Sequence, residues 1–145
     1  MKLSIHPTVK MDPSVVVEEG VVIRAHTTIK EGARIERDTL IKSHSEIGRD
    51  VHIGPSVSIG TAAILAEGSI IAGGASLDDD VVLLAGAHVC PWVTLYYGVT
   101  LGAGATVEAG ATIGSNVWVR DRAYVAANAV VPCPSFIEAL TRHFY

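Results

Sequence analysis

Aliphatic residues recur at every sixth position along most of the chain. From Ile5 to Val131, every place in this register is Ile, Leu or Val, with Met11 as the single exception. The register four places further on, from Val9 to Ala129, contains only Val, Ala, Ser and Thr. A period of six excludes an amphipathic helix, whose apolar pattern recurs near every 3.6 residues.

This period predicts short strands separated by turns. Residues two apart on a strand point to the same side, so Val9 and Met11 point inward together and the residue between them points outward. Three places after each aliphatic residue, Gly is the commonest type and Asn and Asp are frequent, and these types tolerate a left-handed backbone conformation. Three strands and three turns close one coil, so the pattern returns to the same side at every eighteenth position. We therefore expect a single-stranded parallel β-helix of about seven coils, stacked about 4.8 Å apart.

The period is predicted to stop after Val131, at Pro132-Cys133-Pro134. The segment from Ser135 to Glu138 fits a capping box at the start of a helix. Apolar residues follow at helical spacing; they are Phe136, Ile137, Leu140 and Phe144. The sequence thus predicts a β-helix over residues 1–131 and a short C-terminal α-helical tail over residues 132–145. We expect this tail to cover the open end of the coils or to dock on a neighbour.

Composition narrows the classes of function. The net charge of −4 and the pI near 5.8 argue against binding to nucleic acid or to an anionic membrane. The N-terminus has no apolar run typical of a signal peptide, and Gly or a charged residue interrupts every apolar stretch before it reaches membrane-spanning length. Cys90 and Cys133 form no disulfide framework and match no zinc spacing. We expect two free thiols in a cytoplasmic protein.

The repeat, written [LIV]-[GAED]-x-x-[STAV]-x, resembles the hexapeptide-repeat family of left-handed parallel β-helices over most of the chain. Most members are acyltransferases that use acyl-CoA and work as homotrimers, with active sites between subunits. The resemblance implies left-handed coils, a homotrimer and acetyl-CoA or a similar co-substrate for this chain. The stretch 40–50 is similar to sugar-lipid acyltransferases of the family, and the stretch 93–102 is similar to serine acetyltransferases. We expect transfer of an acyl group to a sugar or amino acceptor.

Three side chains are candidates for the catalytic work. Residues 18 apart stack on neighbouring coils, so His44 and Asp80 are predicted to flank a dip at Gly60-Thr61-Ala62 on one corner, where a ligand could lie. His88 points outward from a strand in the middle of the chain. Either histidine could act as the general base that deprotonates the acceptor. Each also has a structural reading, as a turn residue or as an exposed strand residue.

Two further features concern the co-substrate and assembly. Arg120 and Arg122, on the last turns, are candidates for binding the CoA phosphates. Gly and Ala in the C-terminal coils would let a pantetheine arm approach the backbone. An apolar outward patch with an adjacent corner of small residues predicts an interface between three copies of the chain. Its members are Ile64, Ala66, Val82, Leu84 and Trp118, with Gly68, Ala85, Gly86, Ala103 and Gly104 on the corner.

The sequence also departs from the family. In many sugar acyltransferases of the family the catalytic histidine stands two places after the core aliphatic residue, and here Asp79 and Tyr97 hold that place. A long loop and a basic residue after the last coil are missing as well. A non-enzymatic structural or assembly β-helix, or an idealised engineered scaffold, therefore stays open. A weaker alternative is a metal-dependent, γ-carbonic-anhydrase-like protein that uses His26, His44 and Asp80, although no histidine pair has that family's spacing and no metal is expected.

Overall fold

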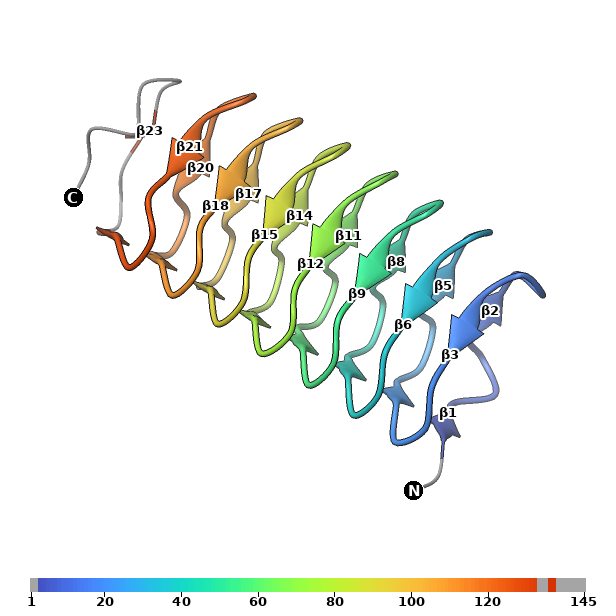
Figure 1. Ribbon diagram of the computed structural model, residues 1–145. Helices are drawn as coiled ribbons and strands as arrows, with labels where there is room; N and C mark the ends of the chain where they lie inside the picture. Colours follow the sequence, from blue (N-terminus) through green and yellow to red (C-terminus); the bar gives the residue numbers. More distant parts are fainter. Residues whose placement is uncertain (1–2, 133–135, 138–145) are drawn as a thin grey trace.

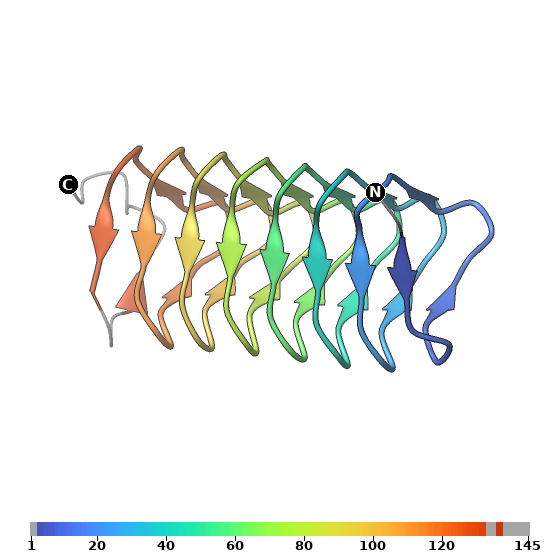
Figure 2. The same ribbon diagram turned by 90° about the horizontal axis from the view of Figure 1, so that it is seen from below.

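The computed structural model describes residues 3–132 and 136–137 of the chain, and it shows a parallel β-solenoid (Figures 1 and 2). Each described strand spans two positions and pairs in parallel with the strand three places before or after it along the chain, as β10 does with β13 through Ser58 and Ser76. Three strands make one coil, and the ends of the chain lie at opposite ends of the stack. The predicted all-β fold of about seven stacked coils is confirmed. No helix among the described residues could cross a membrane.

The strands form three parallel sheets, one on each side of the coil. Sheet A consists of β1 (Ser4–Ile5), β4 (Val22–Ile23), β7 (Leu40–Ile41), β10 (Ser58–Ile59), β13 (Ser76–Leu77), β16 (Thr94–Leu95), β19 (Thr112–Ile113) and β22 (Val130–Val131). Sheet B consists of β2 (Lys10–Met11), β5 (Thr28–Ile29), β8 (Glu46–Ile47), β11 (Ile64–Leu65), β14 (Val82–Leu83), β17 (Thr100–Leu101), β20 (Trp118–Val119) and β23 (Phe136–Ile137). Sheet C consists of β3 (Val16–Val17), β6 (Arg34–Ile35), β9 (His52–Ile53), β12 (Ile70–Ile71), β15 (His88–Val89), β18 (Thr106–Val107) and β21 (Tyr124–Val125).

Three rows of turns join the sheets, and we name each row after the two sheets that it joins. Corner AB contains residues 6–8, 24–26, 42–44, 60–62, 78–80, 96–98 and 114–116. Corner BC contains residues 12–14, 30–32, 48–50, 66–68, 84–86, 102–104 and 120–122. Corner CA contains residues 18–20, 36–38, 54–56, 72–74, 90–92, 108–110 and 126–128. An outward side chain on a strand or corner therefore lies beside the side chains at the equivalent positions of the coils before and after it.

The core is a single column of side chains, which come from the two registers that point inward. The aliphatic register and the small register are buried together from Val21 to Val131. The buried hydroxyls in this column donate hydrogen bonds to backbone carbonyls, as Ser45 Oγ does to Gly60 O at 2.9 Å and Thr39 Oγ1 does to Gly54 O at 2.9 Å. Among the described residues no buried side-chain polar atom lacks a partner. Small polar residues therefore fit the inward register without the cost of a buried unsatisfied group.

The turns adopt the left-handed conformation that their composition predicts. Every turn residue of this register from Gly20 to Asn128 has a φ between 56° and 79°. Glycine leaves room where the next coil sends a carboxylate back across the turn. A Cβ on Gly32 would overlap Oδ1 of Asp50, so another residue there would push this carboxylate aside. The turns also hold Trp92 and Arg122, whose large side chains are unusual in this conformation.

The predicted start of the C-terminal helix is wrong. Phe136 and Ile137 form strand β23, which pairs in parallel with β20 and extends sheet B. Ile137 lies six positions after Val131 and Ser135 holds the small register, so the repeat continues past the prolines. Residues 138–145, where the rest of the helix was predicted, lie outside the described residues.

Candidate functional site

The predicted catalytic residues lie on two different sides of the β-helix. His44 and Asp80 share corner AB but are two coils apart, with Ala62 between them in the stack. His88 lies on the outer face of sheet C, between Ile70 and Thr106. The structure therefore does not bring His88 together with His44 or Asp80. A site built on His88 must draw its other groups from sheet C or the corners beside it.

The two histidines of corner AB stack on each other. The ring centroids of His26 and His44 are 5.0 Å apart, with 31° between the ring planes, and both residues are exposed. Asp80 lies two coils beyond His44 and does not join the pair. The described part of the chain contains no group of three His, Cys, Asp or Glu side chains that could hold a metal ion. The three-residue metal corner considered from the sequence does not assemble.

Asp80 and its neighbours form a hydrogen-bonded turn. Oδ1 of Asp79 accepts a hydrogen bond from the N–H of Thr61 at 2.8 Å, and Oδ1 of Asp78 accepts one from the N–H of Asp79 at 2.7 Å. The hydrogen bond between Tyr97 and the Asp80 carboxylate raises the pKa of Tyr97 above its usual value. These contacts give the acidic turn a structural role, and Asp80 faces Tyr97 rather than His44.

Corner BC carries a strip of bare backbone in its middle coils. Gly68, Gly86 and Gly104 follow one another in the stack, because the N–H of Gly86 donates to Glu67 O and the N–H of Gly104 donates to Ala85 O, each at 3.0 Å. A Cβ on Gly68 or Gly86 would find its nearest neighbour only at 4.0 Å. This bare strip (Gly68, Gly86 and Gly104) leaves the turn backbone of three successive coils open to a ligand.

The bare strip has a histidine beside it and an arginine at its end. Arg122 is next in the stack after Gly104, and its Cγ lies 3.6 Å from the position of a Cβ on Gly104. Arg120 holds its guanidinium 5.2 Å from the ring centroid of Trp118. His88 follows Gly86 by two positions and is half-buried on sheet C. His88, the bare strip and both arginines therefore lie along one edge of the molecule, where Figure 1 shows the turns between sheets B and C.

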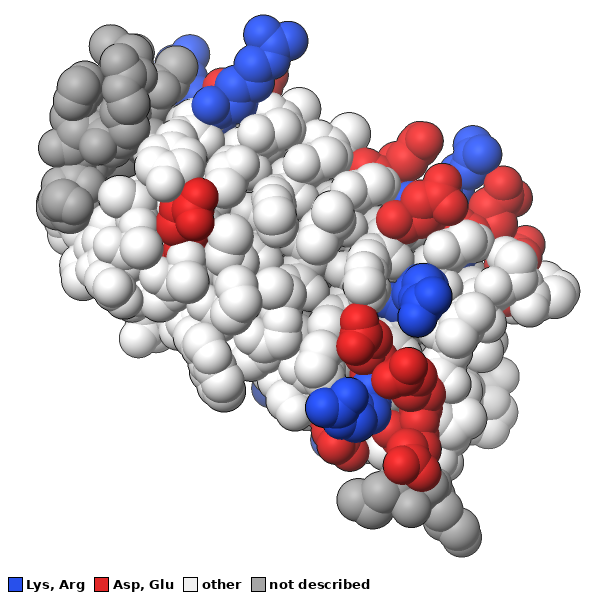
Figure 3. All heavy atoms as spheres, viewed as in Figure 1, with Lys and Arg blue, Asp and Glu red and all other residues white. Residues whose placement is uncertain are grey.

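The surface of sheet B beside this edge is apolar in the central coils. Ile64 and Trp118 are exposed on the sheet, and Leu84 is exposed where the sheet meets corner BC. The sequence contains no Lys or Arg between Arg49 and Arg120. Figure 3, which views the molecule from the side of sheet C, shows charged side chains gathered over the N-terminal coils and few over the central ones. The apolar patch predicted from the sequence is thus an exposed surface of this chain.

Trp92 is a conspicuous surface residue that the sequence analysis did not single out. It is 72% exposed and holds a turn position of corner CA at a φ of 63°. A Cβ on Gly74 would lie 2.5 Å from Cε3 of Trp92, so the indole rests on bare backbone. Pro55 and Arg37 share with Trp92 a hollow of about 320 Å³. The sequence feature that could have identified it is a large aromatic residue at a turn position where Gly, Asn and Asp predominate.

Cys90 forms a small cluster with Glu108 and Tyr124 at the edge of sheet C. It is a free thiol, as predicted, whereas Cys133 lies outside the described residues. Its Sγ is 3.9 Å from Oε1 of Glu108. Burial, and then the nearby Glu108 carboxylate, raises the pKa of the Cys90 thiol. Burial and a hydrogen bond to Glu108 likewise raise the pKa of Tyr124. A thiol with a raised pKa is a poor nucleophile at neutral pH, so Cys90 is not a catalytic candidate.

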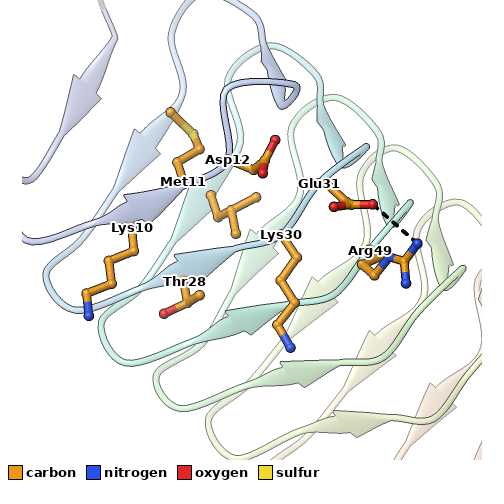
Figure 4. Close-up of a pocket in the computed structure, with 8 residues that line it drawn as sticks. Lys10, Met11, Asp12, Thr28, Lys30, Glu31 and Arg49 are labelled. Carbon is orange, nitrogen blue, oxygen red and sulfur yellow. Dashed lines mark ion pairs between the residues drawn. The ribbon is translucent and has the colours of Figure 1, made fainter.

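Another hollow lies at the N-terminal end, on sheet B and corner BC (Figure 4), with a volume of about 370 Å³. Most of the basic side chains that line this hollow lie close to carboxylates. Arg49 pairs with Glu31 at 3.2 Å, which is the dashed contact in Figure 4, and Lys30 lies 3.8 Å from Glu46 outside the hollow. No histidine is among the residues that line it, so this hollow offers neither a general base nor a strong anion site.

Residues 1–96 match the family described as the GMPPB C-terminal domain. Comparison with individual curated proteins finds no significant match.

Comparison with solved structures finds acyltransferases of the same fold. The UDP-N-acetylglucosamine acyltransferase LpxA from Bacteroides fragilis is 15% identical over 93% of this chain and 66% of its own, with a TM-score of 0.73. The acetyltransferase domain of PglB from Neisseria gonorrhoeae, solved with acetyl coenzyme A, is 18% identical over 90% of this chain and 54% of its own, with a TM-score of 0.50. The chain thus spans about half to two thirds of these proteins. The resemblance to the hexapeptide-repeat β-helix of acyltransferases is confirmed for the fold.

Proposed function

The chain belongs to the GMPPB C-terminal domain family, and from the geometry of corner BC we propose that it is an acyl-CoA-dependent acyltransferase whose reaction takes place along that corner. The acyl group is acetyl or a similar short chain, and the acceptor is a sugar or an amino compound. The observation that carries the proposal is the line formed by His88, the bare strip and Arg122. The likeness to solved acyltransferases supports it, because they share this β-helical fold and one of them was solved with acetyl coenzyme A.

Each part of this line matches one part of an acyl-CoA molecule. The bare strip lets an extended, uncharged pantetheine arm lie against the turn backbone without meeting a side chain. Arg120 and Arg122 bring two guanidinium groups to one end, where phosphate groups would form charge-assisted hydrogen bonds. His88, near the middle of the strip, supplies an imidazole where the thioester would lie.

The reaction needs one base and no redox step. His88 takes the proton from the acceptor hydroxyl or amine as that group attacks the thioester carbonyl. The new C–O or C–N bond forms, the C–S bond breaks, and the proton passes from His88 to the departing CoA thiolate. His44 and Asp80 face another side of the molecule and take no part in this scheme. A role for His44 would require a neighbouring copy to carry it to corner BC.

The test is an acyl-transfer assay that follows CoA release from acetyl-CoA with a panel of sugars and amino sugars. His88→Ala should lower kcat by about a hundredfold or more, the usual size of general-base catalysis. His52→Ala is the matched control, because His52 holds the same outward place on sheet C two coils earlier. It should leave kcat unchanged. Equal rates for His88→Ala and the wild type would remove this mechanism.

A second candidate function is a non-catalytic assembly domain. The observation that favours it is the apolar surface of sheet B, because contiguous exposed apolar residues usually form interfaces. The matched family is itself described as a C-terminal domain. This candidate predicts the same self-association as the first but no turnover of acetyl-CoA. Turnover that depends on His88 would decide against it.

In either case we propose that three copies associate through this apolar surface. Ile64, Leu84 and Trp118 would then be covered by a neighbour. Corner BC, next to them, would form one wall of a cleft between two copies. This arrangement would also bring groups from a neighbour to the side of the bare strip that faces away from His88.

A further inference from the structure

A polar recess lies at the start of corner AB, on the side of the molecule away from the bare strip. It has a volume of about 230 Å³ and is built mainly by residues of sheet A and corner AB. Its polar lining residues are Lys42, Ser58, Ser76, Asp78, Thr94 and Tyr96. The dip expected from Gly60-Thr61-Ala62 is therefore a real recess, but Lys42, Asp78 and Tyr96 form its walls rather than His44 and Asp80.

Gly60 lets two successive coils pack closely at the floor of this recess. It is buried, and a Cβ at this position would overlap the carbonyl carbon of Asp78 and lie 2.6 Å from the N–H nitrogen of Asp79. No side chain can occupy that space because the next coil passes directly over it. The backbone at the floor of the recess is thus fixed by the close packing of the two coils, and the side chains of Lys42, Asp78 and Tyr96 form the walls around it.

A row of free hydroxyl groups crosses the recess. Ser58, Ser76 and Thr94 pair as outward residues of β10, β13 and β16, so their side chains stand side by side. None of the three hydroxyls has a hydrogen-bond partner among the described residues. Each hydroxyl can both donate and accept, and three in a row can follow a ligand that does the same.

Opposite charges stand at the recess without neutralising each other. Lys42 is half-buried, and the ion pairs of the described residues do not include Lys42 or Asp78. Asp78 uses Oδ1 to accept the N–H of Asp79, which leaves Oδ2 for a ligand. One ammonium and one carboxylate therefore offer strong donors and strong acceptors to the same small space.

Tyr96 adds an aromatic wall. It is 46% exposed and stands in corner AB directly after β16, one coil beyond Asp78. An exposed ring beside hydroxyl, ammonium and carboxylate groups presents an apolar surface to one face of a ligand and polar groups to its edge.

From this combination we propose that the recess binds a neutral carbohydrate, one monosaccharide unit in size. A sugar ring carries C–H groups on its face, which suit Tyr96, and hydroxyls around its edge, which suit Asp78, Lys42 and the hydroxyl row. A phosphate is disfavoured by the Asp78 carboxylate, and an apolar ligand would leave both charges without partners. The recess contains none of the residues of the proposed acyl-transfer site, so the two proposals stand or fall separately.

The test is an NMR titration of the ¹⁵N-labelled full chain with D-glucose and with N-acetyl-D-glucosamine at millimolar concentrations. Either sugar should give saturable shifts centred on the amides of Gly60, Ser76, Asp78 and Tyr96. Asp78→Asn and Tyr96→Ala should each weaken binding by about tenfold, as expected for the loss of a bond to a charged group or of a ring contact. Asp78→Asn keeps the Oδ1 acceptor for the Asp79 N–H, so the variant is expected to fold.

Matched controls are Glu67→Gln, an exposed carboxylate on corner BC, and Tyr124→Ala, an exposed tyrosine on sheet C. Both should bind the sugar as the wild type does, and so should His88→Ala. Three results would overturn the proposal. These are no saturable shift with either sugar, shifts that Asp78→Asn and Tyr96→Ala leave unchanged, or stronger effects on the same amides from glycine or inorganic phosphate.

Discussion

Apart from the partly exposed inward residues before Val21, the coils formed by residues 3–50 and those formed by residues 51–132 have the same interior and different exteriors. Ile35 in the first region and Leu95 in the second are 1% and 0% exposed. Outside, more than half of the charged side chains of the chain fall at or before Asp50. The three ion pairs of the described residues involve only positions 30–52. The charged side chains of residues 51–107 are few, and all of them are acidic.

This difference separates what the fold requires from what the fold leaves free. Stacking in coils of equal length fixes the inward registers in both regions, because each inward side chain must fill the same space as its neighbours above and below. The outward positions are under no such constraint. The surface of the N-terminal coils is therefore an ordinary charged surface, and the exposed apolar, aromatic and glycine positions of the later coils need a further explanation.

The largest effects should be equal in the two regions. Ile35→Ala and Leu95→Ala each leave a cavity in the core and should each lower the free energy of unfolding by about 2–5 kcal/mol. The outward neighbours Arg34→Ala and Thr94→Ala should change it by no more than about 0.5 kcal/mol. Urea unfolding followed by circular dichroism measures all four. A cost at Ile35 well below that at Leu95 would show that the two regions do not share one cooperative core.

The next largest effect, on the association of three copies, should appear only in the coils formed by residues 51–132. Ile64→Lys places a charge in the apolar surface while leaving Glu46 as a neighbour on the next strand. It should weaken trimer association by about 2 kcal/mol or more, as expected at the centre of an interface. Thr28→Lys, in the same column of sheet B two coils earlier, should have no such effect. Sedimentation at micromolar concentrations measures both, and a monomeric wild type would contradict the predicted interface.

A smaller effect concerns the turns, which are alike in both regions. Ala62 holds a φ of 60°, which costs a non-glycine residue about 1–2 kcal/mol. Ala62→Gly should relieve most of that strain, offset by about 0.4–1 kcal/mol from the more flexible unfolded chain. A net gain in thermal stability is expected. Ala63→Gly, at a buried inward position, should lower stability instead, and a loss of stability in Ala62→Gly would show that the turn is not strained.

The smallest effect concerns Cys90. Because its pKa is raised, the folded protein favours the neutral thiol, and this contribution to stability is lost as the pH rises through the folded pKa. In a Cys133→Ser background, alkylation of Cys90 by iodoacetamide at pH 8 should be several-fold slower than that of glutathione. Glu108→Gln removes the neighbouring carboxylate and should speed the reaction. A rate equal to that of glutathione would contradict this environment.

The sequence predicted the interior better than the exterior for a physical reason. The inward aliphatic register repeats from Ile5 to Val131, so a single exception such as Met11 does not hide the pattern. The same logic should have extended the repeat to Ile137, but the local signals of two prolines and a capping box outweighed one more period. Left-handed winding stays a prediction from the resemblance.

Site residues were harder to predict because a site depends on which outward columns adjoin. The rule that residues 18 positions apart stack on neighbouring coils correctly placed His26 beside His44 and located the dip at Gly60. It did not reveal that Tyr97 engages Asp80, nor that Lys42 and Tyr96 line the recess, since side-chain direction is not encoded in the period. The bare strip was visible as glycines in the sequence. Its openness followed only from the distances to the next coil.

The central claim is that the edge formed by corner BC binds acyl-CoA, and calorimetric titration of acetyl-CoA into the full chain tests it most directly. The account predicts saturable binding at micromolar concentrations, loss of that binding in the Arg120→Ala and Arg122→Ala double variant, and unchanged binding in Arg49→Ala, an arginine on the same corner four coils earlier. No binding by the wild type, or equal binding by the double variant, would contradict it.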